Sequence, residues 1–426
     1  MYKCAVTSLG CKVNQCEAEA IKTQMKDMGY EICDFSEKAD VYIINTCCVT
    51  QEGERKSRQM VRRAHTLNEN AEIFVTGCAC QKEPETFKNI DGVKIVCGNS
   101  KKHLLPKMIK EGLNGIFVDD MAKYECYDEM PDSAVEKTRA FIKVQDGCNN
   151  FCSYCIIPYL RGRERSRNIE NIIKESTKLR DMGFKEIVIN GIHLSSYGKE
   201  WDFNPSLKDV VKEICHIQGI ERVRLGSLEP RVITDEFLKV LSENKEFCPN
   251  FHLSLQSGSD TVLKRMNRKY STSEYFSAVQ RIRKFYPQAS ISTDIITGFP
   301  GETNEEFNET LDFVNKVGFA WIHVFPYSKR EGTVADKMPN QIEKEIKNQR
   351  AHVLSKLANE KGEEYRTQFI GKTKSVLCET NENNIQSGLT KEHILVQFES
   401  AQIENEIVNV KITKVTKNGL WGERIN

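Results

Sequence analysis

Long apolar runs, a signal segment, an excess of charge and internal repeats are all missing from this sequence of 426 residues. No run approaches the roughly 18 apolar residues of a membrane-spanning helix, and residues 1–6 turn polar too soon for a signal segment, so we expect a cytoplasmic protein without membrane contact. The 61 Lys and Arg residues balance 60 Asp and Glu residues, so net charge indicates no acidic partner. Without repeats, the chain is globular and has room for about two to four domains.

Cysteine is abundant and unevenly placed. The chain has 16 cysteines, of which 13 lie at or before Cys155. In a reducing cytoplasm, thiols at this density are more often metal ligands or catalysts than disulfide partners. The sequence therefore predicts sulfur chemistry in its first third.

The order of predicted elements indicates an α/β protein with a small β tail. Strand and helix patterns alternate over residues 1–113, which predicts a parallel sheet. We interpret the acidic segment 114–137, which lacks a sustained period, as a linker. Six further β/α repeats within 138–365 predict a partial or complete parallel barrel, and the short strands of 366–426 predict a small antiparallel β-barrel.

The strongest motif is a CxxxCxxC spacing directly after a predicted strand, formed by Cys148, Cys152 and Cys155. Three thiolates on one loop can hold three irons of a 4Fe-4S cluster and leave the fourth iron open to a substrate or cofactor. Zinc is the alternative, but structural zinc sites usually have a second CxxC or CxxH half, and none follows.

A second set of three cysteines comes from distant segments. Cys11, Cys47 and Cys78 each follow a predicted strand, at separations of 36 and 31 residues, which suit βαβ units. Consecutive parallel strands place their carboxyl ends at one sheet edge, so the three thiols should converge. Free cysteines are also common as buried strand-end residues, and Cys80 remains an alternative third ligand.

Several longer stretches complete the pattern, and with them the chain resembles the radical S-adenosylmethionine (radical SAM) methylthiotransferases over its whole length. Within that family it most resembles the enzymes that modify threonylcarbamoyladenosine in tRNA. The stretches are LGCKVNQ at 9–15, NTC at 45–47, GCNNFC at 147–152, LQSGS at 255–259, TDIITGFPGET at 293–303 and HVFPYSKR at 323–330.

The resemblance implies an N-terminal iron–sulfur domain, a radical SAM core with a partial (β/α)6 barrel, and a TRAM domain that binds tRNA. It also implies two 4Fe-4S clusters and S-adenosylmethionine. The cluster at Cys148, Cys152 and Cys155 would cleave S-adenosylmethionine to a radical, and the cluster at Cys11, Cys47 and Cys78 would carry the added sulfur. The product would be a methylthio group at carbon 2 of threonylcarbamoyladenosine, at position 37 of the tRNA anticodon loop. The sulfur donor and the electron donor are not indicated.

Further site residues are expected at the strand ends of the barrel, because all its carboxyl-end loops share one face. Tyr154 can lie beside the adenine or pack in the core. The basic loop Arg161, Arg163, Arg165 and Arg167 is expected to contact tRNA phosphates, which need local charge and not a high total charge. The residues expected around the open iron are Asn190, Gly191, Gln256, Ser257, Asp294 and Gly298.

Two other functions remain open at this point. A sister enzyme that acts on isopentenyladenosine in tRNA or on a ribosomal-protein aspartate would share every cluster motif. A two-cluster electron carrier without catalysis would explain the six ligands but neither the barrel nor the open irons.

Overall fold

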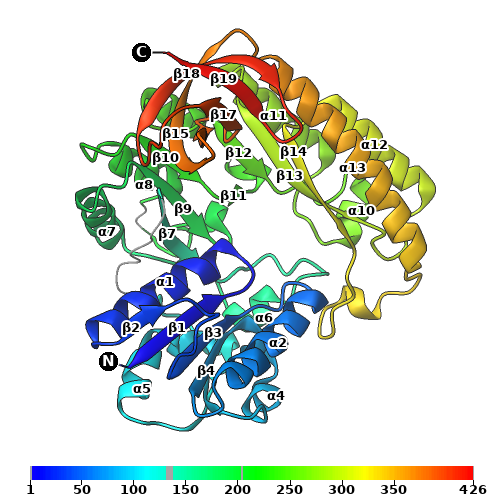
Figure 1. Cartoon of the computed structure of the whole chain (residues 1–426). Helices are drawn as coiled ribbons and strands as arrows, with labels where there is room; N and C mark the ends of the chain where they lie inside the picture. The colour runs from blue at the N-terminus through cyan, green and yellow to red at the C-terminus, as the bar shows by residue number, and fades with distance from the viewer. Residues whose placement is uncertain (1, 131–137, 203–204, 426) are drawn as a thin grey trace.

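The computed structural model describes residues 2–130, 138–202 and 205–425, arranged as an N-terminal sheet, a central set of β/α repeats and a C-terminal barrel (Figure 1). Pro131, in the expected linker, lies outside the described residues. No helix among the described residues is both long and apolar enough to cross a membrane.

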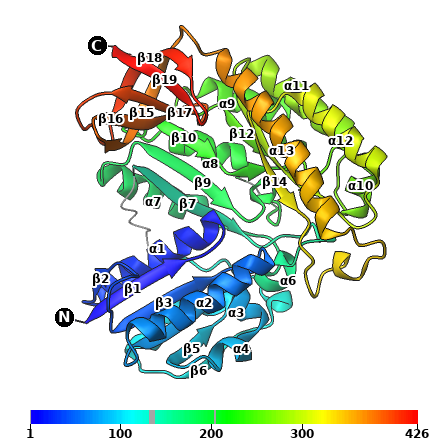
Figure 2. The ribbon, with the colours of Figure 1, turned by 45° about the vertical axis from the view of Figure 1, so that its right-hand side comes forward.

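The N-terminal sheet has six parallel strands in the order β2-β1-β3-β4-β5-β6. Helices α1 and α5 cover one face, and α2, α3 and α4 cover the other, so the central strands are buried on both sides (Figure 2). The strands are β1 Lys3–Ser8, β2 Glu31–Cys33, β3 Val41–Thr46, β4 Glu72–Gly77, β5 Val93–Cys97 and β6 Gly115–Phe117. The helices are α1 Lys12–Asp27, α2 Gln51–Leu67, α3 Cys78–Lys82, α4 Pro84–Lys88 and α5 Leu105–Lys110, with the 3-10 turn η1 Asn99–Leu104 before α5.

Strand β6 corrects the linker prediction. It lies inside the segment 114–137 and pairs with β5 through Ile95 and Gly115. A strand of three half-buried residues is too short to show a period-2 pattern, so its sequence resembles that of a loop.

Two four-stranded sheets with intervening helices form the centre of the molecule. Their orders are β10-β9-β7-β8 and β11-β12-β13-β14, every pairing is parallel except that of β8 with β7, and one apolar cluster runs beneath both sheets. The two outer strands, β8 and β14, do not pair, so the barrel is partial, as the predicted fold class requires. The strands are β7 Arg139–Asp146, β8 Arg165–Ser166, β9 Glu186–Gly191, β10 Arg222–Leu225, β11 Ser227–Leu228, β12 Asn250–Leu253, β13 Ser290–Thr297 and β14 Trp321–Pro326.

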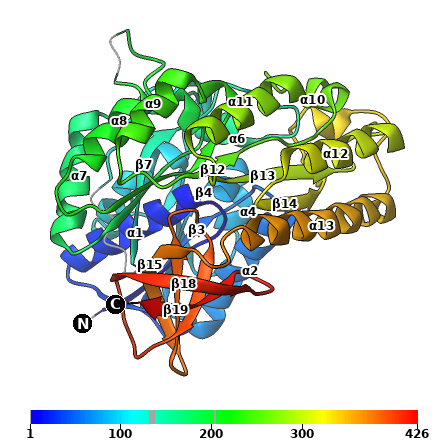
Figure 3. The same ribbon diagram turned by 90° about the horizontal axis from the view of Figure 1, so that it is seen from above.

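Helices cover the outer side of these strands (Figure 3). Helix starts are fixed by local chemistry: Ser271 and Glu274 form a capping box on α11, and Thr303 and Glu306 do the same on α12. The helices are α6 Ile157–Arg161, α7 Ile169–Asp181, α8 Leu207–Cys215, α9 Asp235–Glu243, α10 Asp260–Arg265, α11 Thr272–Phe285, α12 Asn304–Val317 and α13 Lys344–Thr367.

The C-terminal strands close into a barrel in the order β15-β16-β17-β19-β18, as expected for a TRAM domain. Arg222, the first residue of β10, donates to the carbonyls of Leu389 at 2.7 Å and Ser375 at 2.8 Å. The barrel therefore docks at the amino ends of the core strands, opposite the carboxyl ends where the cysteines lie. Its strands are β15 Thr373–Glu382, β16 Ile385–Thr390, β17 Leu395–Glu399, β18 Ile407–Val415 and β19 Leu420–Ile425.

Candidate active site

The cysteine loop follows β7 and is held by backbone contacts from several directions. Gly147 has φ +70°, and a Cβ there would lie 1.8 Å from the carbonyl oxygen of Arg163, so only glycine fits. The amide of Cys148 donates to the carbonyl of Gly162 at 3.1 Å, and the amide of Ser153 donates to the carbonyl of Met266 at 3.0 Å. These contacts fix the three thiols of the loop relative to the strand ends.

The loop thiols suit an iron–sulfur cluster. Burial raises the pKa of the Cys148 thiol to about 12 and that of Cys155 to about 11, so iron must displace their protons when it binds. Arg268 Nη1 lies 3.2 Å from Cys152 Sγ, and the amide of Asn150 lies 3.5 Å from Cys148 Sγ. Soft thiolates with N–H donors nearby are the environment in which 4Fe-4S clusters are held.

Glu229, which follows β11, organises the polar groups beside this loop. Its carboxylate accepts hydrogen bonds from Asn150 and from Arg268, both at 2.9 Å, and lies 3.3 Å from His193 Nε2. Burial alone would raise its pKa, but the hydrogen bond with His193 and the charge of Arg268 lower the pKa to about 2. Neither Glu229 nor the role of Arg268 was predicted from the sequence. The available signal was the position of Glu229 shortly after the alternating polar and apolar residues at 222–225, which predict a strand.

Some of the residues predicted at the barrel strand ends make hydrogen bonds or close contacts within the fold. Asn190 is buried and donates to the carbonyl of Val188 at 3.0 Å, and a Cβ on Gly191 would lie 2.9 Å from the Gln145 side chain. The amide of Gln256 donates to the carbonyl of Asp294 at 2.8 Å. Gln256 has φ +72°, a strained value for a non-glycine residue that is common at functional sites.

Three further predicted residues lie on or near β13. The Asp294 carboxylate is partly exposed and 3.2 Å from His252 Nε2. Ser257 is buried against Thr310, whereas Gly298 has φ +69° and packs against Lys347, where a Cβ would lie 2.1 Å from Cγ of the lysine. Of these three, Asp294 alone presents an accessible polar group.

Tyr154 belongs to an apolar cluster. Its ring lies 6.5 Å from that of Phe299 in an edge-on arrangement, and both pack with Met266 and Tyr327. The side chain is half-buried, so part of the ring remains accessible from the loop.

The second set of cysteines lies at the ends of β1, β3 and β4, which are neighbours in the N-terminal sheet. Gly10 has φ +90°, and a Cβ there would lie 2.2 Å from Cys47 Sγ, so the loops that carry Cys11 and Cys47 nearly touch. Thiolate charges on Cys11 and Cys78 raise the pKa of Cys47, which reaches about 11 mainly through burial. The structure therefore brings Cys11, Cys47 and Cys78 together.

Cys78 differs from the other thiols of this set. A hydrogen bond from Cys48, opposed by burial and helped by the charges of Arg161 and Lys102, lowers the pKa of Cys78 to about 5. Arg161 Nε lies 3.4 Å from its sulfur. Cys80 instead donates to the carbonyls of Gly77 at 3.2 Å and Cys97 at 3.4 Å, and its thiol is fully buried.

Within the described ranges, no three His, Cys, Asp or Glu side chains stand close enough to share one metal ion. A cluster has a different requirement, because each thiolate binds its own iron atom. Both cysteine sets offer the three soft thiol donors that this arrangement needs.

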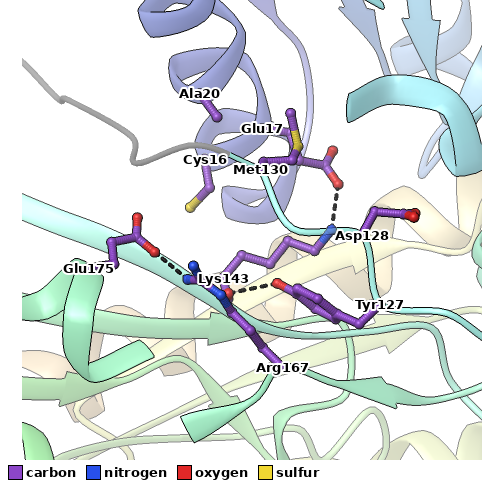
Figure 4. Close-up of a pocket in the computed structure, with 9 residues that line it drawn as sticks. All are labelled: Cys16, Glu17, Ala20, Tyr127, Asp128, Met130, Lys143, Arg167 and Glu175. Atoms are coloured by element: carbon purple, nitrogen blue, oxygen red, sulfur yellow. Dashed lines mark hydrogen bonds and ion pairs between the residues drawn. The ribbon is translucent and has the colours of Figure 1, made fainter. Parts of the chain in front are cut away.

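Arg161 connects the two cysteine sets through a buried ion network. It is fully buried and donates to both carboxylate oxygens of Glu17 and both of Asp146, all at 3.0 Å. Lys143 lies 3.0 Å from Glu17 (Figure 4). Lys143 also lies 2.6 Å from Asp146, and Lys102 pairs with Glu17. Glu17 belongs to the N-terminal sheet domain and Asp146 to the core, so the network spans their interface.

This burial corrects the prediction that the basic loop contacts tRNA phosphates. Arg161, Arg165 and Arg167 are all buried. Arg167 pairs with Glu175 (Figure 4) and also with Glu129. Buried guanidinium groups that are satisfied by carboxylates do not contact phosphates. Arg163 is exposed and lies 4.8 Å from the Phe151 ring centre.

Arg330 lies beside the second set of thiols. It donates to the carbonyl of Cys48 and lies 3.5 Å from Glu54. Burial raises the pKa of Cys47 and that of Cys155 to about 11, and the positive charge of Arg330 opposes both rises.

Two family models and a solved structure define the class of protein to which the chain belongs. The Radical SAM superfamily model matches residues 142–314, and the model of Uncharacterized protein family UPF0004 matches residues 3–98. The fold is shared with the radical S-adenosylmethionine methyltransferase TsrM from Kitasatospora setae, with a TM-score of 0.58 and 13% identity over 79% of this chain and 74% of that one. The cysteine loop and the partial barrel are therefore those of a radical SAM protein.

Relatives at higher identity then give the family. Threonylcarbamoyladenosine tRNA methylthiotransferase MtaB of Bacillus subtilis (strain 168) is 40% identical over 97% of this chain and 94% of its own length. The tRNA-2-methylthio-N(6)-dimethylallyladenosine synthase of Clostridium novyi (strain NT) is 37% identical over 99% of this chain and 96% of its own length. The chain belongs to the radical SAM tRNA methylthiotransferases, enzymes that use S-adenosylmethionine and two 4Fe-4S clusters to transfer a methylthio group. Membership of this enzyme family removes the electron-carrier alternative.

Proposed function

We propose that this enzyme inserts a methylthio group at carbon 2 of threonylcarbamoyladenosine, at position 37 in the anticodon loop of cytoplasmic tRNA. The supporting observation is that the relatives of this name from Bacillus subtilis and Chlamydia pneumoniae are 40% and 38% identical, each over 97% of this chain. Dimethylallyladenosine is the second candidate substrate, because the Clostridium novyi relative covers 99% of the chain.

We assign the cluster that binds S-adenosylmethionine to Cys148, Cys152 and Cys155, and the second cluster to Cys11, Cys47 and Cys78. The three loop thiolates would hold the first cluster, which would supply the electron for reductive cleavage of S-adenosylmethionine. Arg268 and the backbone N–H of Asn150 stabilise the thiolates. Glu229 orients both residues, because it accepts hydrogen bonds from Arg268 and from the side chain of Asn150. Asn190, Gly191, Gln256, Ser257, Asp294 and Gly298 remain the candidate lining of the cofactor site.

This assignment implies a division of labour along the chain. The N-terminal domain, which we extend past residue 113 to include β6, would hold the second cluster. Residues 138–365 would form the radical SAM core, and residues 366–426 would bind tRNA. Arg163 is our remaining candidate in the basic loop for a phosphate contact, because it is exposed.

Mass spectrometry of tRNA nucleosides from a strain that lacks this protein tests the substrate. Loss of the 2-methylthio group from threonylcarbamoyladenosine alone is the expected result. Loss from dimethylallyladenosine alone would refute the proposal and favour the second candidate. Complementation with wild-type protein should restore the modification, whereas Cys148→Ala should not. In reduced, reconstituted protein, Cys148→Ala should also form no 5'-deoxyadenosine while keeping iron in the N-terminal domain.

A further inference from the structure

Strand β14 exposes a row of three aromatic side chains. Trp321 and Phe325 are 47% and 45% exposed, and His323 between them is also exposed. Alternate residues of a strand share one face, so the three rings point the same way. The intervening Ile322 is buried in the core beneath α13, and Val324 packs against that core. We call Trp321, His323 and Phe325 the aromatic row.

The three rings are close neighbours along the strand. The ring centres of Trp321 and His323 are 6.0 Å apart in an edge-on arrangement with 66° between the ring planes, and those of His323 and Phe325 are 6.3 Å apart with the rings within 24° of parallel. The strand is the outermost of its sheet, so among the described residues no further strand pairs with its free edge. Large aromatic rings that stay exposed side by side mark an interaction surface, because their contact with water is unfavourable until a partner covers them.

The aromatic row runs from the C-terminal barrel toward the cysteine loops. Strand β14 is parallel to β13, so Trp321 lies at the amino end, where the barrel docks, and Phe325 lies toward the carboxyl end (Figure 2). Two residues further on, the Tyr327 ring lies 5.4 Å from Phe299, which packs on Tyr154 of the cysteine loop. The aromatic row therefore lies between the barrel and the candidate active site.

The polar neighbours of the row favour a neutral aromatic surface. His323 pairs in register with Asp294, and its ring lies 6.1 Å from that of His252. Burial lowers the pKa of His323, opposed by the charge of Asp294 and helped by that of His252. The imidazole therefore presents an uncharged ring at neutral pH. A neutral row can contact a base face but offers no cation to a phosphate.

We propose that the aromatic row stacks unpaired bases of the RNA loop that carries the target nucleoside. Every base has a π face, so stacking on aromatic side chains holds single-stranded RNA without sequence readout. A loop whose target base is extruded must also keep its neighbouring bases in place. This inference rests on the proposed function, since it requires an RNA loop as substrate.

Fluorescence anisotropy with a labelled anticodon stem-loop RNA and the cluster-loaded full chain tests the proposal. Trp321→Ala and Phe325→Ala should each weaken binding by on the order of tenfold. Trp321→Tyr should retain most of the affinity, whereas Trp321→Leu should lose it, because leucine is apolar but has no π face. Val353→Ala, at an exposed apolar position on α13, is the matched control and should bind like wild type.

Two outcomes would overturn the proposal. Wild-type affinity in Trp321→Ala, or equal affinity in Trp321→Leu and Trp321→Tyr, would show that the rings do not stack on bases. A blunt RNA duplex without a loop should bind wild type and variants equally, and a selective loss there would also contradict stacking. If wild type bound the stem-loop no better than the duplex, the proposed loop substrate would fail as well, which separates that failure from failure of the aromatic row alone.

Discussion

Replacing Arg161 by methionine is expected to lower the free energy of unfolding by about 3 kcal/mol. Methionine keeps the apolar stem but removes the guanidinium group that donates to Glu17 and Asp146. The Arg161 side chain is fully buried, so water does not replace these contacts when the guanidinium group is removed. Both carboxylates would then be buried with fewer partners.

The magnitude follows from what remains in the network. Removing one member of a buried ion pair costs about 3–5 kcal/mol, because the other charge is left without compensation. Lys102 still pairs with Glu17, and Lys143 still contacts both carboxylates, so we expect the lower end of this range. Against a typical total of about 5–15 kcal/mol, such a loss is large.

Denaturant unfolding followed by circular dichroism, on samples of equal iron content, measures this change. Arg163→Met is the matched control: the side chain lies two residues away and is exposed, so its change should stay within about 0.5 kcal/mol. In a double-mutant cycle with Glu17→Gln, the two losses should be less than additive. A loss below about 1 kcal/mol for Arg161→Met, or full additivity in the cycle, would refute the reasoning.

Three other changes test the site. Gly147→Ala should prevent cluster loading at the cysteine loop, measured by iron content and absorbance, because its Cβ would overlap the Arg163 carbonyl; normal loading would contradict the loop geometry. Glu229 has a folded pKa of about 2 against an ordinary 4.5, so its stabilisation is present above pH 4.5 and is lost as pH falls toward 2. Glu229→Gln should therefore be less stable at pH 7 and should lose less stability over that acid range. The same loss of unfolding free energy as in wild type between pH 4.5 and 2 would count against this. Cys78→Ala should lose one cluster while Cys80→Ala keeps both, and the opposite iron contents would reassign the third ligand.

Much of the architecture was predictable because each strand end, and the cysteine that follows it, can be recognised within a short window of the sequence. Cys11, Cys47 and Cys78 follow strands whose apolar runs are plain, and the parallel order then brings them to one edge. The short strand β6 left no such pattern.

The basic loop shows what local pattern does not contain. Four arginines in seven residues predict an exposed cationic surface, yet Arg161 is paired with a carboxylate 144 residues away in sequence. Burial of a charge depends on such distant partners, which no window of the sequence reveals. The same holds for Glu229, whose partners Asn150 and Arg268 come from two other loops.

The docking of the C-terminal barrel has a consequence for how this family can diversify. Arg222 and Arg224 of the core grip main-chain carbonyls of the barrel, including those of Ser375, Leu389 and Lys391. Every residue type offers the same carbonyl, so this attachment is largely indifferent to the side chains of the barrel. The outer surface of the barrel is thus free to change with the RNA it meets, and a barrel exchanged between relatives should still seat on the same two arginines.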